Sequence, residues 1–236
     1  IVHDSGYRGT PVLFSWASTG RTVDYIYDNN SATVARDGLE ETLRQLRAAG
    51  ATRIDIVAHS MGNWLMMETL RQMALSGDRD VHDSLGDVIL ASPDIDVDVF
   101  KSQLRRIGKI DWPISVIVSR DDRALLASSI IAGNRPRVGD YGGDADLASL
   151  GITVIDISGV TSGDRLNHAK FADNPLMVQL LGSRLNEDQM LDGNSDDITR
   201  RIDTMAQGLG QTLGSAAEII VTTPFEVINI AIGGGR

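Results

Sequence analysis

Short runs of almost entirely apolar residues alternate with amphipathic segments along most of the chain. The apolar runs lie at 12–16, 54–58, 87–91, 114–119 and 152–157 and predict buried strands. The segments between and after them carry apolar residues three and four positions apart and predict helices at 33–49, 63–75, 99–106, 124–131 and 175–185. Strands that are apolar throughout and alternate with helices indicate the α/β class, with a mostly parallel sheet covered by helices on both faces.

The pattern changes after residue 185. Residues 186–199 are acidic and polar and predict a linker, whereas residues 202–236 are first amphipathic and then apolar. We therefore expect an α/β domain over residues 1–185, followed by a polar linker and an apolar C-terminal tail over 186–236. We expect the tail to pack on its own domain or on a second copy of the chain, as a homo-oligomer. Weak membrane contact is the remaining alternative, although the tail lacks the Lys and Arg of an interfacial helix.

Composition narrows the classes of function. The net charge of −10 argues against a nucleic-acid partner, which needs clustered Lys and Arg. The absence of cysteine excludes disulfides, a cysteine nucleophile and thiolate metal sites, and it leaves the cellular compartment open. The four histidines show no paired metal-ligand spacing, so we expect neither a metal nor a cofactor. A chain that opens on Ile1, without a Met or a signal core, is expected to be a fragment or a processed product.

The stretch IDIVAHSMGNWLMM places a serine where a predicted strand turns directly into a predicted helix. Ser60 is flanked two positions away by Ala58 and Gly62, which matches the nucleophile-elbow pattern with Ala in its first position. Small residues are needed there because the strand and the helix approach closely around a tight turn. The same turn would present the backbone N–H of Met61, at the start of the helix, as an oxyanion donor.

A serine hydroxyl is a weak nucleophile and needs a base and a group that orients the base. His168 follows the last strand predicted within the domain, which is where the order Ser, acid, His puts the base; the alternative is a solvated loop histidine. His59 adjoins Ser60 in sequence, and we interpret it as a spacer in the elbow. His82 and His3 are interpreted as a surface residue and a residue near the chain end.

Two loops offer the acid. Asp121 and Asp122 follow the strand at 114–119, and Asp94 and Asp96 follow the strand at 87–91. The carboxylates of the second loop can equally favour the first turn of a helix. We favour the first loop and, within it, Asp122, with Asp121 as its rival.

With these residues assembled, the chain resembles the alpha/beta-hydrolase superfamily, and more narrowly a bacterial group of alpha/beta hydrolases of unknown function. The matching pieces run in order from Pro11 to about Pro175: VLFSWAS, DYIYDNNSA, AHSMGNWL, ASPDIDVDVF, SRDDRAL and NHAKFADNP. The resemblance implies Ser60 as nucleophile and His168 as base. It selects Asp122 as the acid, because in that group the acid immediately precedes an x-Ala-Leu segment. It further implies a carboxylesterase- or lipase-like reaction through an acyl-enzyme on a small-molecule ester or other acyl substrate.

One departure from the superfamily pattern bears on activity. Such proteins carry an earlier strand ending in a His-Gly-type loop that supplies a second oxyanion N–H, and we expect this chain to lack its first strands and that loop. Losing one oxyanion donor costs roughly 3 kcal/mol of transition-state stabilisation. The sequence therefore leaves two hypotheses: a serine hydrolase, or a binding or scaffold protein that keeps the fold with weak or absent chemistry.

Overall fold

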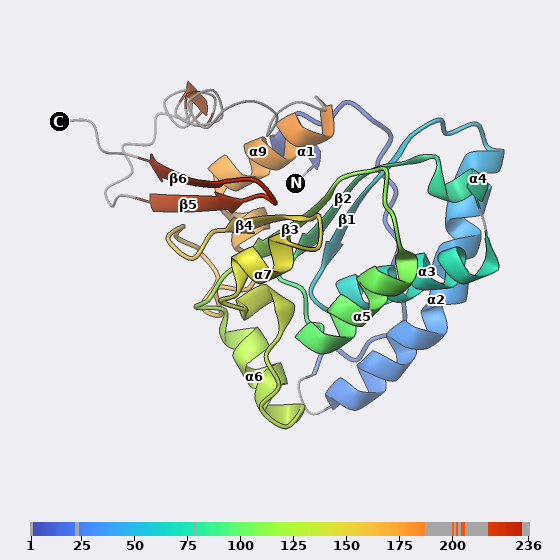
Figure 1. The fold of residues 1–236 in the computed structure, drawn as a ribbon, viewed down its shortest axis with the longest axis horizontal. Helices are drawn as coiled ribbons and strands as arrows, with labels where there is room; N and C mark the ends of the chain where they lie inside the picture. The colour runs from blue at the N-terminus through green and yellow to red at the C-terminus, as the bar shows by residue number, and fades with distance from the viewer. Residues whose placement is uncertain are drawn as a thin grey trace.

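A sheet of six described strands, in the order β1-β2-β3-β4-β5-β6, forms the centre of the molecule (Figure 1). The structure is a computed structural model that describes residues 2–21, 24–77, 79–186, 200, 202, 204–205 and 217–232. The strands are β1 (Ile54–His59), β2 (Leu85–Ala91), β3 (Ile114–Val118), β4 (Thr153–Asp156), β5 (Ala217–Thr222) and β6 (Val227–Ile232). The pairs from β1 to β4 are parallel, and β5 and β6 join antiparallel. The predicted α/β class with a mostly parallel sheet is confirmed.

Helices cover both faces of this sheet. In Figure 1, α2, α3 and α5 lie on one side of the sheet, and α9 and α1 lie on the other. The helical segments are α1 (Val2–Ser5), α2 (Tyr25–Ala48), α3 (Met61–Ser76), α4 (Arg79–His82), α5 (Val97–Ile107), α6 (Arg123–Ile131), η2 (Val138–Asp140), α7 (Asp144–Ala148), α8 (Lys170–Asp173) and α9 (Pro175–Asn186). None of the described helices is both long and apolar enough to cross a bilayer.

The parallel strands bring their carboxyl ends to one edge of the sheet. His59 pairs with Ala91, and Ala91 pairs with Ile117, so the chain leaves β1, β2 and β3 at the same level. The loops that follow these ends carry Ser60, Ser92 and Asp122. Functional residues of parallel sheets gather at this edge, and α6 starts from it.

Successive side chains of each strand point to opposite faces of the sheet, so the strands contribute to two separate hydrophobic cores. Val88 and Leu90 point to the face covered by α3 and α5, where they join Met67 and Phe100. The intervening strand residues point to the other face and pack under α8 and α9. Strands with apolar residues on both faces are the reason for the uninterrupted apolar runs in the sequence.

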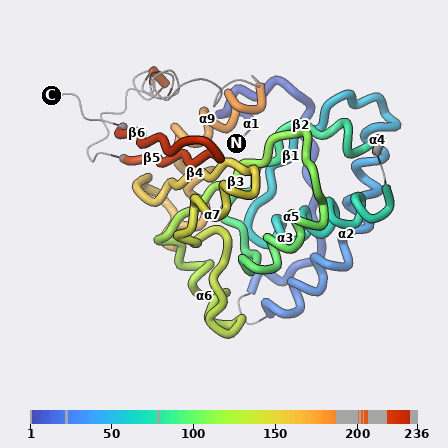
Figure 2. Tube along the Cα trace, in the orientation of Figure 1, coloured from blue at the N-terminus to red at the C-terminus, as the bar shows by residue number. Residues whose placement is uncertain are grey.

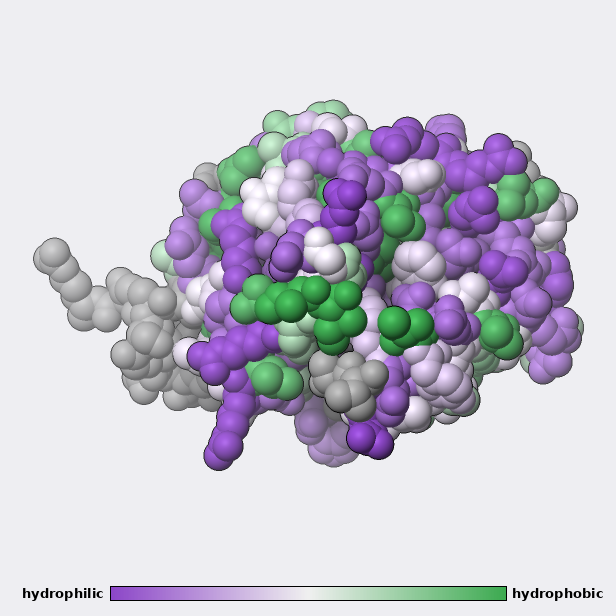
Figure 3. Space-filling model, turned by 90° about the horizontal axis from the view of Figure 1, so that it is seen from below, coloured by the Kyte–Doolittle hydropathy of each residue, from purple (hydrophilic) through white to green (hydrophobic). Residues whose placement is uncertain are grey.

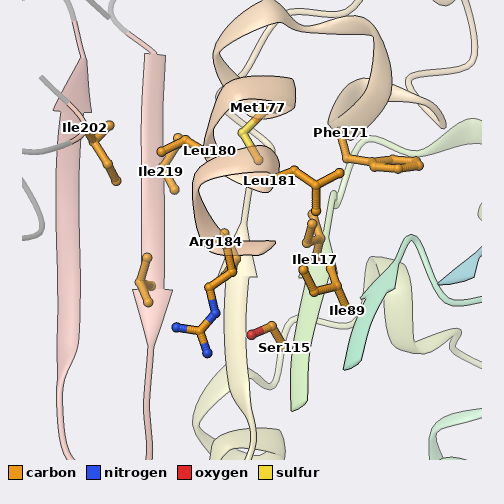
Figure 4. Close-up of a pocket in the computed structure, with 12 residues that line it drawn as sticks. Ile89, Ser115, Ile117, Phe171, Met177, Leu180, Leu181, Arg184, Ile202 and Ile219 are labelled. Atoms are coloured by element: carbon orange, nitrogen blue, oxygen red, sulfur yellow. The ribbon is translucent and has the colours of Figure 1, made fainter. Parts of the chain in front are cut away.

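A cavity of about 50 Å³ separates α9 from the sheet (Figure 4). Its lining is apolar apart from Ser115 and Arg184, and Leu181 projects into the space between α9 and the strands. The Arg184 side chain continues past the cavity to a buried ion pair, with Nε 2.8 Å and Nη2 2.7 Å from Asp87 Oδ1. The cavity therefore lies within the second core, with a buried ion pair beside it.

Most helix boundaries lie close to those predicted, and two segments differ. Helix α2 begins at Tyr25 rather than at residue 33, and it ends at Ala48, shortly before Gly50, whose φ of 100° is a left-handed conformation that favours glycine. Between α6 and β4, where the apolar pattern predicts no helix, the chain forms the short helices η2 and α7. The first turns of α2 contain Asn and Ser residues, which do not favour a helix interior. The apolar pattern alone therefore predicts a first helical residue that lies too late in the sequence.

The predicted strand at 12–16 is wrong. This segment has no strand conformation, and Val12 and Leu13 are 56% and 92% exposed. A strand requires a hydrogen-bonded neighbour, and no described strand other than β2 pairs with β1. The segment instead runs beside the helices, where Phe14 approaches Gly38 and Trp16 approaches Gly62.

The division at residue 186 does not match the sheet. Residues 217–232, predicted as part of an apolar tail that packs on its own domain or on a second copy, form the hairpin β5–β6, and β5 pairs with β4 from Thr222↔Val154 to Ile220↔Asp156. Figure 2 shows this C-terminal hairpin lying along β4, although the two are far apart in the sequence. Ile219 and Ile230 are buried in the second core. The sequence pattern did not predict the hairpin, because it assigned residues 202–236 to one tail although Pro224 breaks the apolar run. Of the linker predicted at 186–199, Asn186 ends α9 and residues 187–199 lie outside the described residues.

Candidate active site

Ser60 occupies a strained turn between β1 and α3. Its backbone has φ 53° and ψ −124°, a conformation that costs a residue with a Cβ about 1–3 kcal/mol. The Ser60 N–H donates to Ala91 O at 3.1 Å, which ties the turn to the end of β2. A Cβ added at Gly62 would lie 3.3 Å from the Trp16 ring, so the small residue after the serine makes room for this indole. Met61 opens α3, and its N–H therefore has no acceptor within the helix.

Asn63 reinforces the turn and was not anticipated from the sequence. Its side chain is fully buried, and Nδ2 donates to Ser60 O at 2.9 Å and to Ala91 O at 2.8 Å. The one signal in the sequence is a polar residue in the first turn of a helix that is otherwise apolar on nearly all sides. The two bonds hold the carbonyl of Ser60 against the end of β2.

Asp122 and His168 meet directly. Asp122 Oδ2 lies 2.7 Å from His168 Nδ1, and the Asp122 side chain is fully buried, whereas that of His168 is 15% exposed. The other carboxylate oxygen accepts hydrogen bonds from the N–H groups of Ala124 and Leu125, because Asp122 is the N-cap of α6. The start of α6 thus orients the carboxylate of Asp122, and the carboxylate orients the imidazole of His168 through Nδ1.

The neighbouring Asp121 has a different role in the structure. Its carboxylate pairs with the buried ammonium of Lys170 at 2.7 Å and accepts hydrogen bonds from Ser119 Oγ at 2.6 Å and Asn167 Nδ2 at 2.9 Å. Partial burial opposes the charge, but Lys170 and Ser119 outweigh it and hold the pKa of Asp121 below its ordinary value. Asp121 links the loop after β3 to the loop that carries His168.

The loop of His168 is held at its backbone as well. The His168 N–H donates to Asp164 Oδ2 at 2.9 Å, and the Leu166 N–H donates to Asp164 Oδ1 at 3.0 Å. These backbone bonds lower the pKa of Asp164. Within the described residues the Ser60 hydroxyl makes no hydrogen bond with the His168 ring. The structure thus joins Asp122 to His168 and places the elbow at the same edge of the sheet.

The rival acids lie in other arrangements. Asp94 is buried with Arg137, whose Nε is 3.2 Å from Asp94 Oδ1, and it accepts hydrogen bonds from Ser128 Oγ at 2.7 Å and Tyr25 Oη at 3.3 Å. Burial raises the pKa of Asp94 and also raises that of Tyr25 to about 12. Asp96 caps α5 through the N–H groups of residues 98 and 99, as the alternative interpretation expected.

An open cleft of about 480 Å³ lies beside the Asp94 cluster. Its walls come from the starts of α2, α3 and α5 and from the loop before η2; the lining residues are Tyr25, Asn29, Trp64, Asp96, Asp98, Val99, Ala132, Arg135 and Arg137. The Asp94 N–H donates to Ser60 O at 3.3 Å and its carboxylate contacts Tyr25 and Arg137 of the cleft, so Asp94 links the cleft to the backbone of the elbow. Seen from below, apolar side chains gather over α6, where Leu126 and Ile130 are more than half exposed (Figure 3).

No cluster of three or more His, Cys, Asp or Glu that could hold a metal ion occurs in the described part of the chain. Comparison with curated proteins gives no match, and comparison with solved structures gives none either. A family model matches residues 1–184, which is more than half of the chain and includes β1 to β4 and the loops described above. The chain belongs to this family, described as alpha/beta hydrolase of unknown function (DUF900).

Proposed function

We propose that this protein is a serine hydrolase of the carboxylesterase or lipase type, acting through Ser60, His168 and Asp122. The observation that carries the proposal is the 2.7 Å contact between His168 Nδ1 and Asp122 Oδ2 at the edge of the sheet where Ser60 sits in its strained turn. A buried acid on Nδ1 fixes the tautomer that leaves Nε2 as the base.

In this mechanism Ser60 Oγ attacks the carbonyl carbon of an ester or other acyl substrate while His168 Nε2 takes the hydroxyl proton. The Met61 N–H stabilises the negative charge on the carbonyl oxygen. His168 then returns its proton to the leaving group, which departs and leaves an acyl-enzyme on Ser60. Water, activated by the same imidazole, releases the acid. Asp122 remains ionised throughout and stabilises the imidazolium.

The alternative is a hydrolase fold that binds without reacting. The observation that favours it is the absence, among the described residues, of a hydrogen bond from the Ser60 hydroxyl to the His168 ring. Such bonds are often long in unliganded enzymes and tighten with substrate, so we favour the enzyme.

A fluorophosphonate probe separates the two hypotheses. We expect the full chain to be labelled and mass spectrometry to find the adduct on Ser60, with labelling lost in Ser60→Ala and strongly slowed in His168→Gln. An adduct on Ser92 or Ser119 with Ser60 unmodified, or no labelling of a folded chain, would contradict the proposal.

A further inference from the structure

Two side chains at the carboxyl ends of β1 and β2 have no part in the triad and yet reach the loop of His168. His59 Nε2 lies 3.2 Å from His168 O, and Ser92 Oγ donates to the same oxygen at 3.2 Å. Because a carbonyl oxygen only accepts, His59 Nε2 must carry the hydrogen. The carbonyl of the proposed base is therefore bound from two neighbouring strand ends.

Both donors stand on rigid positions. His59 is the last residue of β1 and pairs with Ala91. Ser92 is buried, and its N–H donates to Ile117 O at 3.0 Å, which fixes it to β3. Its φ of 46° is left-handed, a conformation that a residue with a side chain adopts only where its surroundings hold it.

The ring of His59 also packs on the site. Its centroid lies 4.6 Å from that of His168 and 4.9 Å from that of Phe171. Burial lowers the pKa of His59, and the nearby His168 acts in the same direction. A neutral His59 can lie against His168 without adding a like charge when His168 becomes an imidazolium in the reaction.

We propose that His59 and Ser92 are positioning residues that hold the main chain of His168, so that its imidazole stays in register with Ser60. We call this pair of bonds the carbonyl clamp. The proposal rests on the proposed function. The end of β2 contacts both proposed reacting residues. Ala91 O accepts a hydrogen bond from the Ser60 N–H, and the hydroxyl of the next residue, Ser92, donates to His168 O. Nothing in the sequence pattern indicates this role, and the pattern predicts His59 as a spacer in the elbow.

Substitution of His59 tests the clamp by kinetics with p-nitrophenyl acetate. His59→Phe keeps a ring against Phe171 but removes the donor, and we expect kcat to fall about 10- to 100-fold with KM within about twofold, as for a small misplacement of a catalytic group. His59→Gln, whose amide nitrogen can replace Nε2, should recover kcat to within about threefold of the original. His82→Phe makes the same exchange away from the site and should leave kcat unchanged. An unchanged kcat in His59→Phe, or equal losses in His59→Phe and His59→Gln, would overturn the clamp.

Ser92→Gly tests the second donor of the carbonyl clamp, and it keeps the proposal testable if a His59 variant fails to fold. Glycine accepts the left-handed backbone, so the change removes the hydroxyl without adding strain. We expect a fall in kcat of about tenfold, and a loss in the double variant that is smaller than the product of the single losses, because both donors hold one carbonyl. Full activity in a folded Ser92→Gly would remove Ser92 from the proposal.

A readout without turnover separates the clamp from the proposed function. The hydrogen bond between His168 Nδ1 and Asp122 should give a low-field proton signal in NMR spectra of the full chain. We expect it to persist in His82→Phe and Ser60→Ala and to broaden or vanish in His59→Phe while the melting temperature stays close to the original. If the original chain neither reacts with fluorophosphonate nor turns over ester, the proposed function fails, and this signal still decides whether the clamp positions the ring. A signal unaltered in His59→Phe would overturn the clamp.

Discussion

Asp121 and Asp122 are adjacent in the sequence, yet their side chains have different partners and different roles. Asp122 caps α6 and contacts His168, whereas Asp121 turns toward Lys170 and Ser119. Residues that follow each other in a loop point in different directions, so the backbone at the end of β3 selects which carboxylate faces the imidazole. The resemblance named the same residue from a different argument, the x-Ala-Leu segment after it.

Exchanging each carboxylate for an amide should separate the two roles. Asp122→Asn keeps an oxygen to cap α6 but no longer orients the imidazole, so we expect kcat to fall by about 10⁴-fold with little change in melting temperature. Asp121→Asn should keep most activity and lower the melting temperature, because the buried Lys170 loses its counter-charge. Ester hydrolysis and thermal unfolding measure both. The reverse pattern would assign the acid to Asp121.

Protonation of Asp164 should loosen the loop of His168. The hydrogen bonds from the N–H groups of Leu166 and His168 hold the pKa of Asp164 below the ordinary value of 3.8. A carboxyl with a lowered folded-state pKa stabilises the fold above its unfolded pKa, and that contribution is lost as the pH falls through the lowered value.

We therefore expect Asp164→Ala to melt below the original chain at about pH 6, with the gap shrinking as the pH falls below about 3.8. Asp173→Ala, an exposed carboxyl nearby, serves as the control and should show little difference at either pH. A gap for Asp164→Ala that stays constant down to about pH 2.5 would show that this carboxylate does not stabilise the loop.

At the scale of elements, α9 packs on the sheet with a cavity between them. It covers the second face of the sheet across the cavity, and Leu181, like Met177, is a buried residue of α9 that both lines the cavity and belongs to the second core. At the adjacent position a Cβ on Gly182 would lie 1.9 Å from Ser5 O, so glycine is required there for the approach of α1. The helix thus packs tightly on one side and loosely on the other.

Leu181→Ala should lower the free energy of unfolding strongly, because it enlarges a cavity that already exists. Large-to-small changes in a core cost about 2–5 kcal/mol, and the cost grows with the residual cavity. We expect a loss in the upper half of that range in urea unfolding. Gln179→Ala, a half-buried polar position on the same helix, is the matched control and should cost less than about 1 kcal/mol. If Leu181→Ala lowered the free energy of unfolding by as little as the control, α9 would have moved onto the sheet to fill the cavity.

At the scale of the whole molecule, the C-terminal hairpin is part of the fold that presents the site. It covers the edge of β4 and places Ile219, Val221, Ile228 and Ile230 in the second core, each 2% exposed or less. Burying such a side chain contributes about 1.5–3 kcal/mol. Four of them contribute roughly 6–12 kcal/mol, which is comparable to the entire net stability of a domain, about 5–15 kcal/mol.

A chain ending at residue 186 should therefore fail to fold as a soluble, cooperative unit, even though it contains all the proposed catalytic residues. In the full chain, Ile230→Asp should cause a similar loss, and Phe225→Asp, at a turn position that is 95% exposed, should be tolerated. Circular dichroism and size-exclusion chromatography distinguish these outcomes. A truncated chain with an undiminished cooperative transition would restore residue 185 as a domain boundary.

The sequence by itself determined what depends on local pattern. The spacing of apolar residues located β1 to β4 and the five longest described helices, because a strand buried on both faces and a helix buried on one face leave distinct spacings. The elbow could also be recognised locally, since the tight turn at Ser60 requires small residues at fixed positions beside it.

Only the tertiary structure decided which segments pair and where side chains of neighbouring residues point. The apolar segment at 12–16 is not a strand because strand formation depends on a partner's backbone, and the hairpin of residues 217–232 is part of the sheet because β4 offers it an edge. Likewise, nothing local to His59 or Ser92 shows that both reach His168 O across the ends of two strands. These contacts join residues far apart along the chain, and spacing in a sequence carries information only about residues that are near one another.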